Sequence, residues 1–163
     1  MFELDSNLFN PLIHKLIAEL QQKKATLSLA ESCTGGLLSS LITHIPGCSS
    51  VYRGGVCVYS NDLKVELLGV PKHLIEKYGA VSKEVAEAMA TGAGTILKSD
   101  YSISVTGIAG PSGGSKEKPV GTIWCATYGP KGTVSQHFQL QGDRTQNRAE
   151  ISLLAIDMIL RYI

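Results

Sequence analysis

The sequence predicts an α/β protein: a single three-layer α/β/α domain with a mixed, mostly parallel sheet and a late β-hairpin. Helical and strand patterns alternate through the first part of the chain, which is typical of parallel strands covered by helices. Two strand patterns then follow each other across 129–132 (GPKG), which predicts a hairpin and an antiparallel pair. A length of 163 residues suits one domain, so residues 1–163 are expected to form a single unit.

The first elements are two helices on either side of a short strand. An Asn-Pro pair at 10–11 provides an N-cap and a first-turn proline, and apolar residues at 3.6-residue spacing then predict a helix over 11–24. Residues 26–30 (TLSLA) form an apolar run that is typical of a buried strand. After the glycine pair at 35–36, helical spacing resumes and ends before the proline at 46.

The middle of the chain is predicted to hold one strand and three helical segments. Residues 49–59 have strand character but contain a glycine pair, which marks a bulge or a close backbone approach. A short helix over 61–68 follows, and then a helical turn that Pro71 opens. Ser82 caps a longer helix, whose alanine and glycine content predicts close packing on a sheet.

The last part is predicted to complete the sheet and to add a final helix. Residues 101–106 (YSISVT) form a strand that runs into a glycine-rich loop, and the hairpin strands are expected over 120–128 and 133–140. Asp143 and Gln146 have the spacing of a capping box, which predicts where the last helix begins.

Composition and charge exclude several classes of protein. Hydrophobic residues make up 44% and charged residues 18%, so the chain is expected to fold. The formal net charge of +1 gives no overall attraction to nucleic acid or to an anionic membrane. The uncharged stretch 32–52 is broken by turn residues and predicts no membrane segment. The N-terminal residues 1–11 lack a basic region, so we expect no signal peptide and a cytoplasmic location.

The cysteines do not predict a metal site. The four of them form no Cys-x-x-Cys pair and have no metal-ligand spacing to the histidines. We therefore expect reduced, buried thiols and no bound metal.

The first candidate site is the segment 30–36 (AESCTGG), which follows a strand at the sheet edge where ligands bind in open α/β sheets. Ser32 is a candidate nucleophile because its hydroxyl can lie exposed on this turn. Amides at the helix start can then hold the developing oxyanion, and these are expected from Thr34, Gly35 and Gly36. The alternative is that Ser32 or Thr34 only caps the helix.

Cys33 is a rival nucleophile, since a thiol is more reactive than a hydroxyl when its pKa is lowered. Adjacent residues that leave a strand point to opposite sides, so Cys33 is expected to face the core if Ser32 faces the cleft.

The second candidate is the segment 59–64 (YSNDLK), where a strand ends and a helix begins. Lys64 shares a helical stripe with Leu68, so partial burial is expected to lower the pKa of its ammonium group. A neutral amine beside a serine hydroxyl is the base of Ser-Lys catalysis, whereas the alternative is a surface lysine that covers apolar neighbours. Tyr59 is suited either to a substrate hydrogen bond or to packing on the sheet.

Two further segments have the composition of ligand contacts. The loop 106–114 (TGIAGPSGG) is rich in glycine but is neither a dinucleotide nor an NTP-hydrolase fingerprint, and the alternative is a plain flexible loop. Arg144 and Arg148 lie one turn apart at a helix start, where cations oppose the helix dipole. This placement suggests a phosphate clamp, and the alternative is a pair of surface arginines near Glu150.

These segments together resemble the C-terminal domain of the competence/damage-inducible protein CinA, a family that includes nicotinamide mononucleotide deamidases. The resemblance covers about 12–162 and is carried by AESCTGG from Ala30, YSNDLK from Tyr59, GAVS from Gly79, TGIAGPSGG with EKPVGT from Thr106, and GDRTQNR from Gly142. It implies an α/β/α fold, hydrolysis of the carboxamide of nicotinamide mononucleotide to nicotinate mononucleotide and ammonia, no metal or cofactor, and a homo-oligomer.

The resemblance also implies roles for single residues. Ser32 corresponds to the nucleophile and Lys64 to its base, while Tyr59 and Thr106 line the reacting end. The substrate-binding positions that it implies are Cys33, Thr34, Gly35, Gly36, Asn61, Gly107, Ala109, Gly110, Arg144 and Arg148.

Two other functions fit the same residues. One is a non-catalytic module that binds a ligand or a partner in competence or DNA damage, and the other is a Ser-Lys amidase for a different small amide. Many members of the family carry a further N-terminal domain, whose activity is not assigned to this chain.

Overall fold

The computed structural model describes residues 6–163, with side chains from residue 11 onwards, and is built on a five-stranded sheet. The strands lie in the order β2-β1-β3-β4-β5. β1 pairs in parallel with β2 and β3, whereas β4 is antiparallel to both β3 and β5. The predicted mixed sheet with a late hairpin is therefore confirmed. The strands are β1 (Leu27–Glu31), β2 (Tyr52–Cys57), β3 (Tyr101–Gly107), β4 (Thr122–Gly129) and β5 (Gly132–Gln139).

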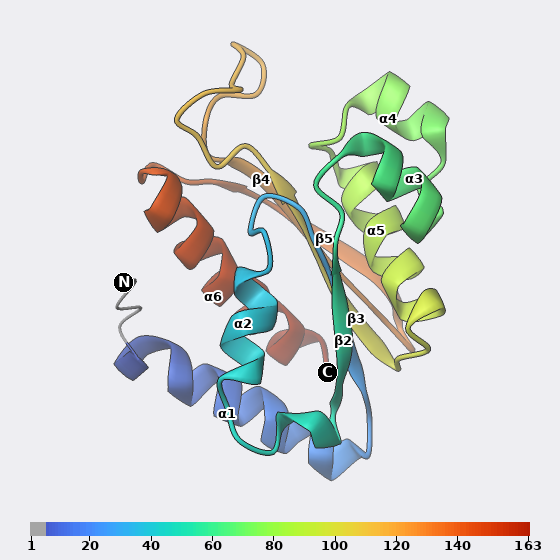
Figure 1. Cartoon of the computed structure of the whole chain (residues 1–163), viewed down its shortest axis with the longest axis vertical. Helices are drawn as coiled ribbons and strands as arrows, with labels where there is room; N and C mark the ends of the chain where they lie inside the picture. The colour runs from blue at the N-terminus through green and yellow to red at the C-terminus, as the bar shows by residue number, and fades with distance from the viewer. Residues whose placement is uncertain (1–5) are drawn as a thin grey trace.

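Six α-helices cover the two faces of the sheet. Figure 1 shows α1, α2 and α6 on one side and α3, α4 and α5 on the other, which confirms the three-layer architecture. The helices are α1 (Ser6–Lys23), α2 (Leu37–Thr43), α3 (Asn61–Leu68), α4 (Lys72–Tyr78), α5 (Lys83–Ile96) and α6 (Arg144–Tyr162). The predicted capping box is present at the start of α6, where Asp143 and Gln146 exchange backbone-to-side-chain hydrogen bonds of 2.8 Å.

The predicted start of the first helix was wrong. α1 begins at Ser6, so Pro11 lies inside the helix and Asn10 is not its N-cap. Proline removes one backbone hydrogen bond from a helix, but the buried apolar stripe of α1 packs on the core and outweighs that loss. Residues 1–5, which belong to the segment predicted to contain no signal peptide, lie outside the described residues.

The edge strand β2 carries the predicted bulge. Leu27 pairs with Tyr52 and Ser28 with Gly54, so Arg53 is the extra residue on β2. β2 starts later than the predicted strand because a 3-10 turn occupies Cys48–Ser50, and it ends at Cys57, two residues before the predicted end.

The expectation that all four thiols are buried was only partly right. All four cysteines are free, and Cys33 and Cys125 are buried, but Cys48 is half-buried and Cys57 is exposed. Cys57 lies on β2, whose exposed positions alternate with half-buried ones because this strand is at the edge of the sheet.

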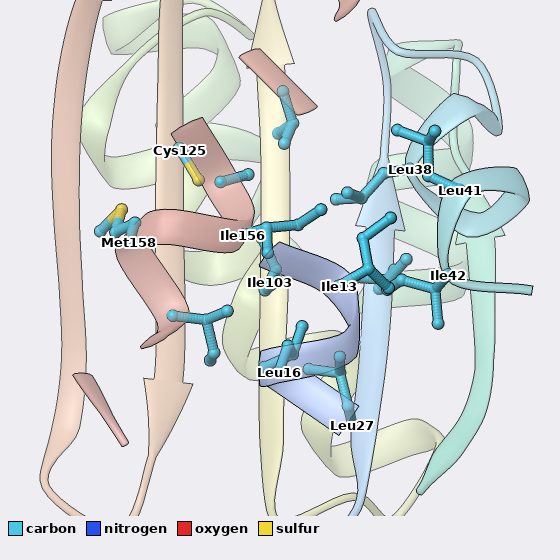
Figure 2. Close-up of a cluster of buried hydrophobic side chains, with 14 of the residues drawn as sticks. Ile13, Leu16, Leu27, Leu38, Leu41, Ile42, Ile103, Cys125, Ile156 and Met158 are labelled. Carbon is cyan, nitrogen blue, oxygen red and sulfur yellow. The ribbon is translucent and has the colours of Figure 1, made fainter. Parts of the chain in front are cut away.

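The two faces of the sheet are packed differently. On the side of α1, α2 and α6, large aliphatic side chains such as Leu16, Leu38 and Ile103 fill the space between the layers (Figure 2). On the α5 side, small residues bring helix and sheet into close contact, as predicted. There the hydroxyls of β3 donate to backbone carbonyls on the helical side: Ser102 to Ala90 (2.5 Å), Ser104 to Ala86 (2.6 Å) and Thr106 to Ala80 (2.9 Å).

Candidate active site

A cleft of about 250 Å³ opens at the carboxyl ends of the parallel strands. The chain leaves β1 through α2 on one face, forms β2, and returns to β3 through helices on the other face. The carboxyl ends of β1 and β3 therefore flank a crevice at the point where the direction of winding changes, which is the usual ligand site of open α/β sheets.

The structure brings most of the predicted site residues to this cleft. Its predicted lining residues are Ser32, Cys33, Tyr59, Asn61, Lys64, Thr106, Gly107, Ala109, Gly110 and Arg144. The remaining predicted residues, which do not line it, are Thr34, Gly35, Gly36 and Arg148. Five further lining residues were not predicted individually, although three of them belong to the loop 106–114 that was expected to contact a ligand: Ala80, Val81, Ile108, Ser112 and Gly113. All five lie within the GAVS segment at 79–82 or the glycine-rich loop at 106–114, which are the sequence patterns that could have pointed to them.

Ser32 lies on the turn between β1 and α2. Its amide donates to the carbonyl of Val105 on β3 (3.0 Å), which extends the strand pairing by one residue. The residue is only 8% exposed, and its hydroxyl has no hydrogen-bond partner among the described residues. The hydroxyl is therefore free for a ligand, and Ser32 does not cap α2.

The start of α2 differs from the predicted oxyanion site. The amide of Gly36 donates to the buried carboxylate of Glu31 (3.0 Å), and that of Gly35 donates to the carbonyl of Ser32 (3.0 Å). Both glycines have positive φ angles, +60° and +90°, so the turn needs residues without a Cβ. Within the described part of the chain, only the amides of Cys33 and Thr34 in this turn have no acceptor.

Cys33 belongs to the hydrophobic core although it contributes to the wall of the cleft. Burial raises the pKa of its thiol to about 12, so the thiolate is scarce at neutral pH. Cys33 is therefore a poor nucleophile, as its position after Ser32 predicted.

This burial predicts slow alkylation of Cys33. Under native conditions at pH 8, iodoacetamide is expected to modify the exposed Cys57 at least tenfold faster than Cys33, as measured by peptide mass spectrometry. Unfolded protein is the control, in which the two rates should converge. Equal rates in the folded protein would contradict the buried assignment.

Lys64 is 2% exposed, which is more burial than the partial burial predicted. Its Nζ donates to the carbonyls of Val58 (3.0 Å), Tyr59 (3.4 Å) and Ser60 (3.5 Å). No carboxylate pairs with it among the described residues, and burial lowers the pKa of its ammonium group. Ser32 and Lys64 line the same cleft, but no hydrogen bond joins them.

Arg144 connects two walls of the cleft at its rim. Its Nη1 donates to the carbonyl of Gly110 (2.9 Å) and its Nη2 to the hydroxyl of Tyr59 (3.0 Å). Tyr59 is 58% exposed and points its hydroxyl at this arginine, so it does not fill the sheet. The two side chains form a polar edge that a ligand can contact.

Arg148 does not converge with Arg144 on a phosphate clamp. Its Nε and Nη2 both donate to the carbonyl of Thr34, at 3.1 and 2.6 Å. The guanidinium therefore holds the turn after Ser32, and Arg148 is not among the residues that line the cleft. A backbone carbonyl therefore faces this cation at the helix start.

Two side chains that the sequence did not single out anchor the surrounding loops. The buried Asn147 donates to the carbonyls of Ala109 and Gly142, at 3.1 and 2.9 Å. Lys118 donates to the carbonyls of Tyr78 and Val81, at 2.6 and 2.7 Å. These contacts fix the glycine-rich loop and the GAVS segment as walls of the cleft.

The charge of the cleft favours an anionic ligand. Arg144, whose guanidinium stays charged at neutral pH, lines it, and its described lining includes no Asp or Glu. Across residues 6–163, no three His, Cys, Asp or Glu side chains gather as a metal site would require. Over the same residues, no helix is both long and apolar enough to cross a bilayer.

Comparison with known proteins decides the family. The CinA C-terminal domain family matches residues 9–163 of this chain. This protein belongs to the CinA C-terminal domain family. A CinA-like protein from Fervidobacterium nodosum is 47% identical over the whole chain, and one from Prochlorococcus marinus subsp. pastoris is 53% identical over 89% of it. The chain spans only 39% and 33% of these two relatives, respectively.

Solved structures of the CinA superfamily share the fold. A competence/damage-inducible protein from Agrobacterium tumefaciens superposes with a TM-score of 0.91 at 36% identity, covering 94% of both chains. A CinA superfamily protein from Escherichia coli gives a TM-score of 0.93 at 31% identity. The match covers all of this chain and 95% of the Escherichia coli chain. A homo-oligomeric state and a cytoplasmic location stay predictions for this CinA-family chain.

Proposed function

We propose that this chain hydrolyses the carboxamide of nicotinamide mononucleotide to nicotinate mononucleotide and ammonia. One observation carries the proposal. A serine hydroxyl without a hydrogen-bond partner and a buried lysine without a carboxylate partner, among the described residues, line one cleft at the switch point of the sheet. Perturbed titratable groups beside a nucleophile in a cleft are the usual mark of an enzyme site.

Ser32 supplies the nucleophile in this proposal. Its Oγ attacks the carboxamide carbon, the hydroxyl proton leaves, and the carbonyl oxygen becomes an oxyanion that the free amide of Cys33, a residue that lines the cleft, can receive. The C–N bond then breaks, and the nitrogen takes a proton and departs as ammonia. Water attacks the acyl-enzyme and releases the carboxylate, which restores Ser32.

Lys64 is the proposed proton acceptor. Its low exposure and lowered pKa make the neutral amine more populated than it is for a lysine exposed to water. Because no hydrogen bond joins Nζ to the Ser32 hydroxyl, the proton passes through a water or after a rotation of the lysine side chain.

The size and charge of the cleft support a mononucleotide substrate. Its volume of about 250 Å³ lies below the ~300–1,000 Å³ typical of drug-sized ligands, which favours a mononucleotide over a dinucleotide. The guanidinium of Arg144 at the rim is the proposed partner of the phosphate.

Ammonia release tests this function directly. Nicotinamide mononucleotide, free nicotinamide and NAD are incubated separately with the protein, and ammonia is measured by a coupled assay. Turnover of the mononucleotide in preference to the other two supports the proposal. If the folded protein releases no ammonia from any of them, the enzyme assignment for this substrate is wrong.

One observation favours the alternative of a non-catalytic binding module. The three carbonyls around Nζ of Lys64 satisfy a charged ammonium, which cannot accept a proton. Binding of nicotinamide mononucleotide without turnover, measured by calorimetry, would support that alternative. Turnover of other small amides with none of this substrate would instead indicate a different Ser-Lys amidase.

The proposed phosphate contact predicts a defect in binding. Arg144→Met is expected to raise KM for nicotinamide mononucleotide about 10- to 100-fold with little change in kcat, because charge-assisted hydrogen bonds contribute about 1.5–3 kcal/mol. Steady-state kinetics measure both constants. Arg161→Met, at the far end of α6, is the control and should leave both unchanged. An unchanged KM in Arg144→Met would remove the phosphate contact.

A further inference from the structure

Glu31 is a buried carboxylate whose oxygens accept hydrogen bonds from residues at the start of α2. It is 1% exposed, and it accepts from the amides of Gly36 (3.0 Å), Leu38 (3.0 Å) and Ser39 (2.8 Å) and from the hydroxyl of Ser39 (2.6 Å). A charged acceptor at a helix N-terminus is favourable, and these four donors compensate its removal from water. Glu31 directly precedes Ser32, so it ties the end of β1 to α2 across the turn.

Arg148 holds the same turn from the opposite side. Its guanidinium donates two hydrogen bonds to the carbonyl of Thr34, a residue 114 positions away in the sequence. It reaches there from α6, which packs against α2. The turn therefore has a side-chain contact at its helical end and another at its centre.

The turn needs such contacts because its backbone is intrinsically adaptable. Gly35 and Gly36 have positive φ angles, and glycine has more conformations to lose than any other residue. The Ser32 hydroxyl and the free amide of Cys33 lie on this turn, which Glu31 holds at its helical end and Arg148 at its centre. A small shift of the turn moves the nucleophile and the oxyanion donor relative to each other.

We propose that Glu31 and Arg148 are positioning residues for the reaction, which hold Ser32 and the amide of Cys33 in a reactive arrangement without contacting the substrate. This inference rests on the proposed function. It differs from the ligand-binding role that the resemblance implied for Arg148, and it assigns Glu31 a role that the sequence did not suggest. Neither side chain lines the cleft, which is the geometric reason for an indirect role.

The test uses variants that keep side-chain volume. Glu31→Gln turns one acceptor oxygen into an amide donor that faces backbone N–H groups, and Arg148→Met removes both donors to Thr34. Each is expected to lower kcat about 100-fold with KM within twofold of wild type, because a displacement of about 1 Å in the reacting groups has an effect of that size. Arg148→Lys keeps one donor and is expected to recover part of kcat.

Matched controls separate positioning from general stability. Asp100→Asn removes a carboxylate that accepts from the amide and hydroxyl of Thr26 (2.8 and 2.7 Å), at the opposite end of the sheet. Arg161→Met removes an arginine from the other end of α6. Both are expected to change thermal stability at most, with kcat retained.

Hydrogen exchange makes the outcome independent of turnover. Amides of residues 35–39 are expected to exchange at least tenfold faster in Glu31→Gln and Arg148→Met than in wild type, while the β4 and β5 amides keep their rates. If wild type is inactive, the proposed function fails, and this exchange alone decides whether the two side chains hold the turn. Faster exchange with unchanged kcat, or unchanged exchange, would overturn the positioning role.

Discussion

Ser32→Ala is expected to lower kcat for nicotinamide mononucleotide by at least about 10³-fold, since loss of a nucleophile removes the covalent route. The fold should tolerate the change. The Ser32 hydroxyl has no hydrogen-bond partner among residues 11–163, and only its amide joins β3. The free energy of unfolding should therefore change by no more than about 0.5 kcal/mol.

The measurement is kcat by ammonia release together with urea denaturation. Ser28→Ala is the control, because Ser28 is a buried serine on β1, the strand that leads to Ser32, and its hydroxyl bonds to Ser99 at the opposite end of the sheet (2.7 Å). That control should lose stability and retain kcat. A Ser32→Ala protein with more than a tenth of the wild-type kcat would exclude Ser32 as the nucleophile.

Lys64→Met is expected to give the second large loss, about 10²- to 10⁴-fold in kcat, which is the usual contribution of a positioned base. Lys64→Arg should not restore activity, because a guanidinium stays protonated and cannot act as a base. In wild type, kcat should rise with pH through the lowered pKa of Lys64, and this rise should be absent from Lys64→Met. Lys72→Met, an exposed lysine on α4, is the control.

The same burial sets the pH dependence of stability. Because the pKa of Lys64 is lower in the folded than in the unfolded protein, the unfolded state binds more protons between the two values. Stability of wild type relative to Lys64→Met should therefore increase as pH rises through the folded pKa towards the unfolded value of about 10.4. Urea denaturation at several pH values from 7 to 10 measures this, and parallel curves would contradict the buried titration.

The fold was predictable because its signals are local. Apolar periodicity, the glycine pair in β2 and the turn residues at 129–132 each act over one or two elements, and they defined the mixed sheet and the layers. The first helix was misjudged at Pro11, where tertiary packing of α1 decides the outcome and the local rule does not.

The site was predictable only in part. Ser32, Lys64 and Thr106 lie on segments that end at the same sheet edge, so strand order alone brings them together. Arg148 was assigned to a ligand because its unfavourable place in the helix dipole needs a compensating acceptor. The acceptor is the carbonyl of a residue 114 positions away in the sequence. A local sequence pattern cannot predict a contact between residues so far apart.

The unequal packing of the two sheet faces sets opposite limits on side-chain volume. Where serine hydroxyls of β3 reach the backbone of α5, there is no room for a larger side chain, and added methylenes would push the helix away from the wall of the cleft. Beneath α1, α2 and α6, the large aliphatic side chains fill the layer, and truncation there leaves a void. Enlarged side chains are therefore expected to do most harm on the α5 face, and truncated side chains on the face of α1, α2 and α6.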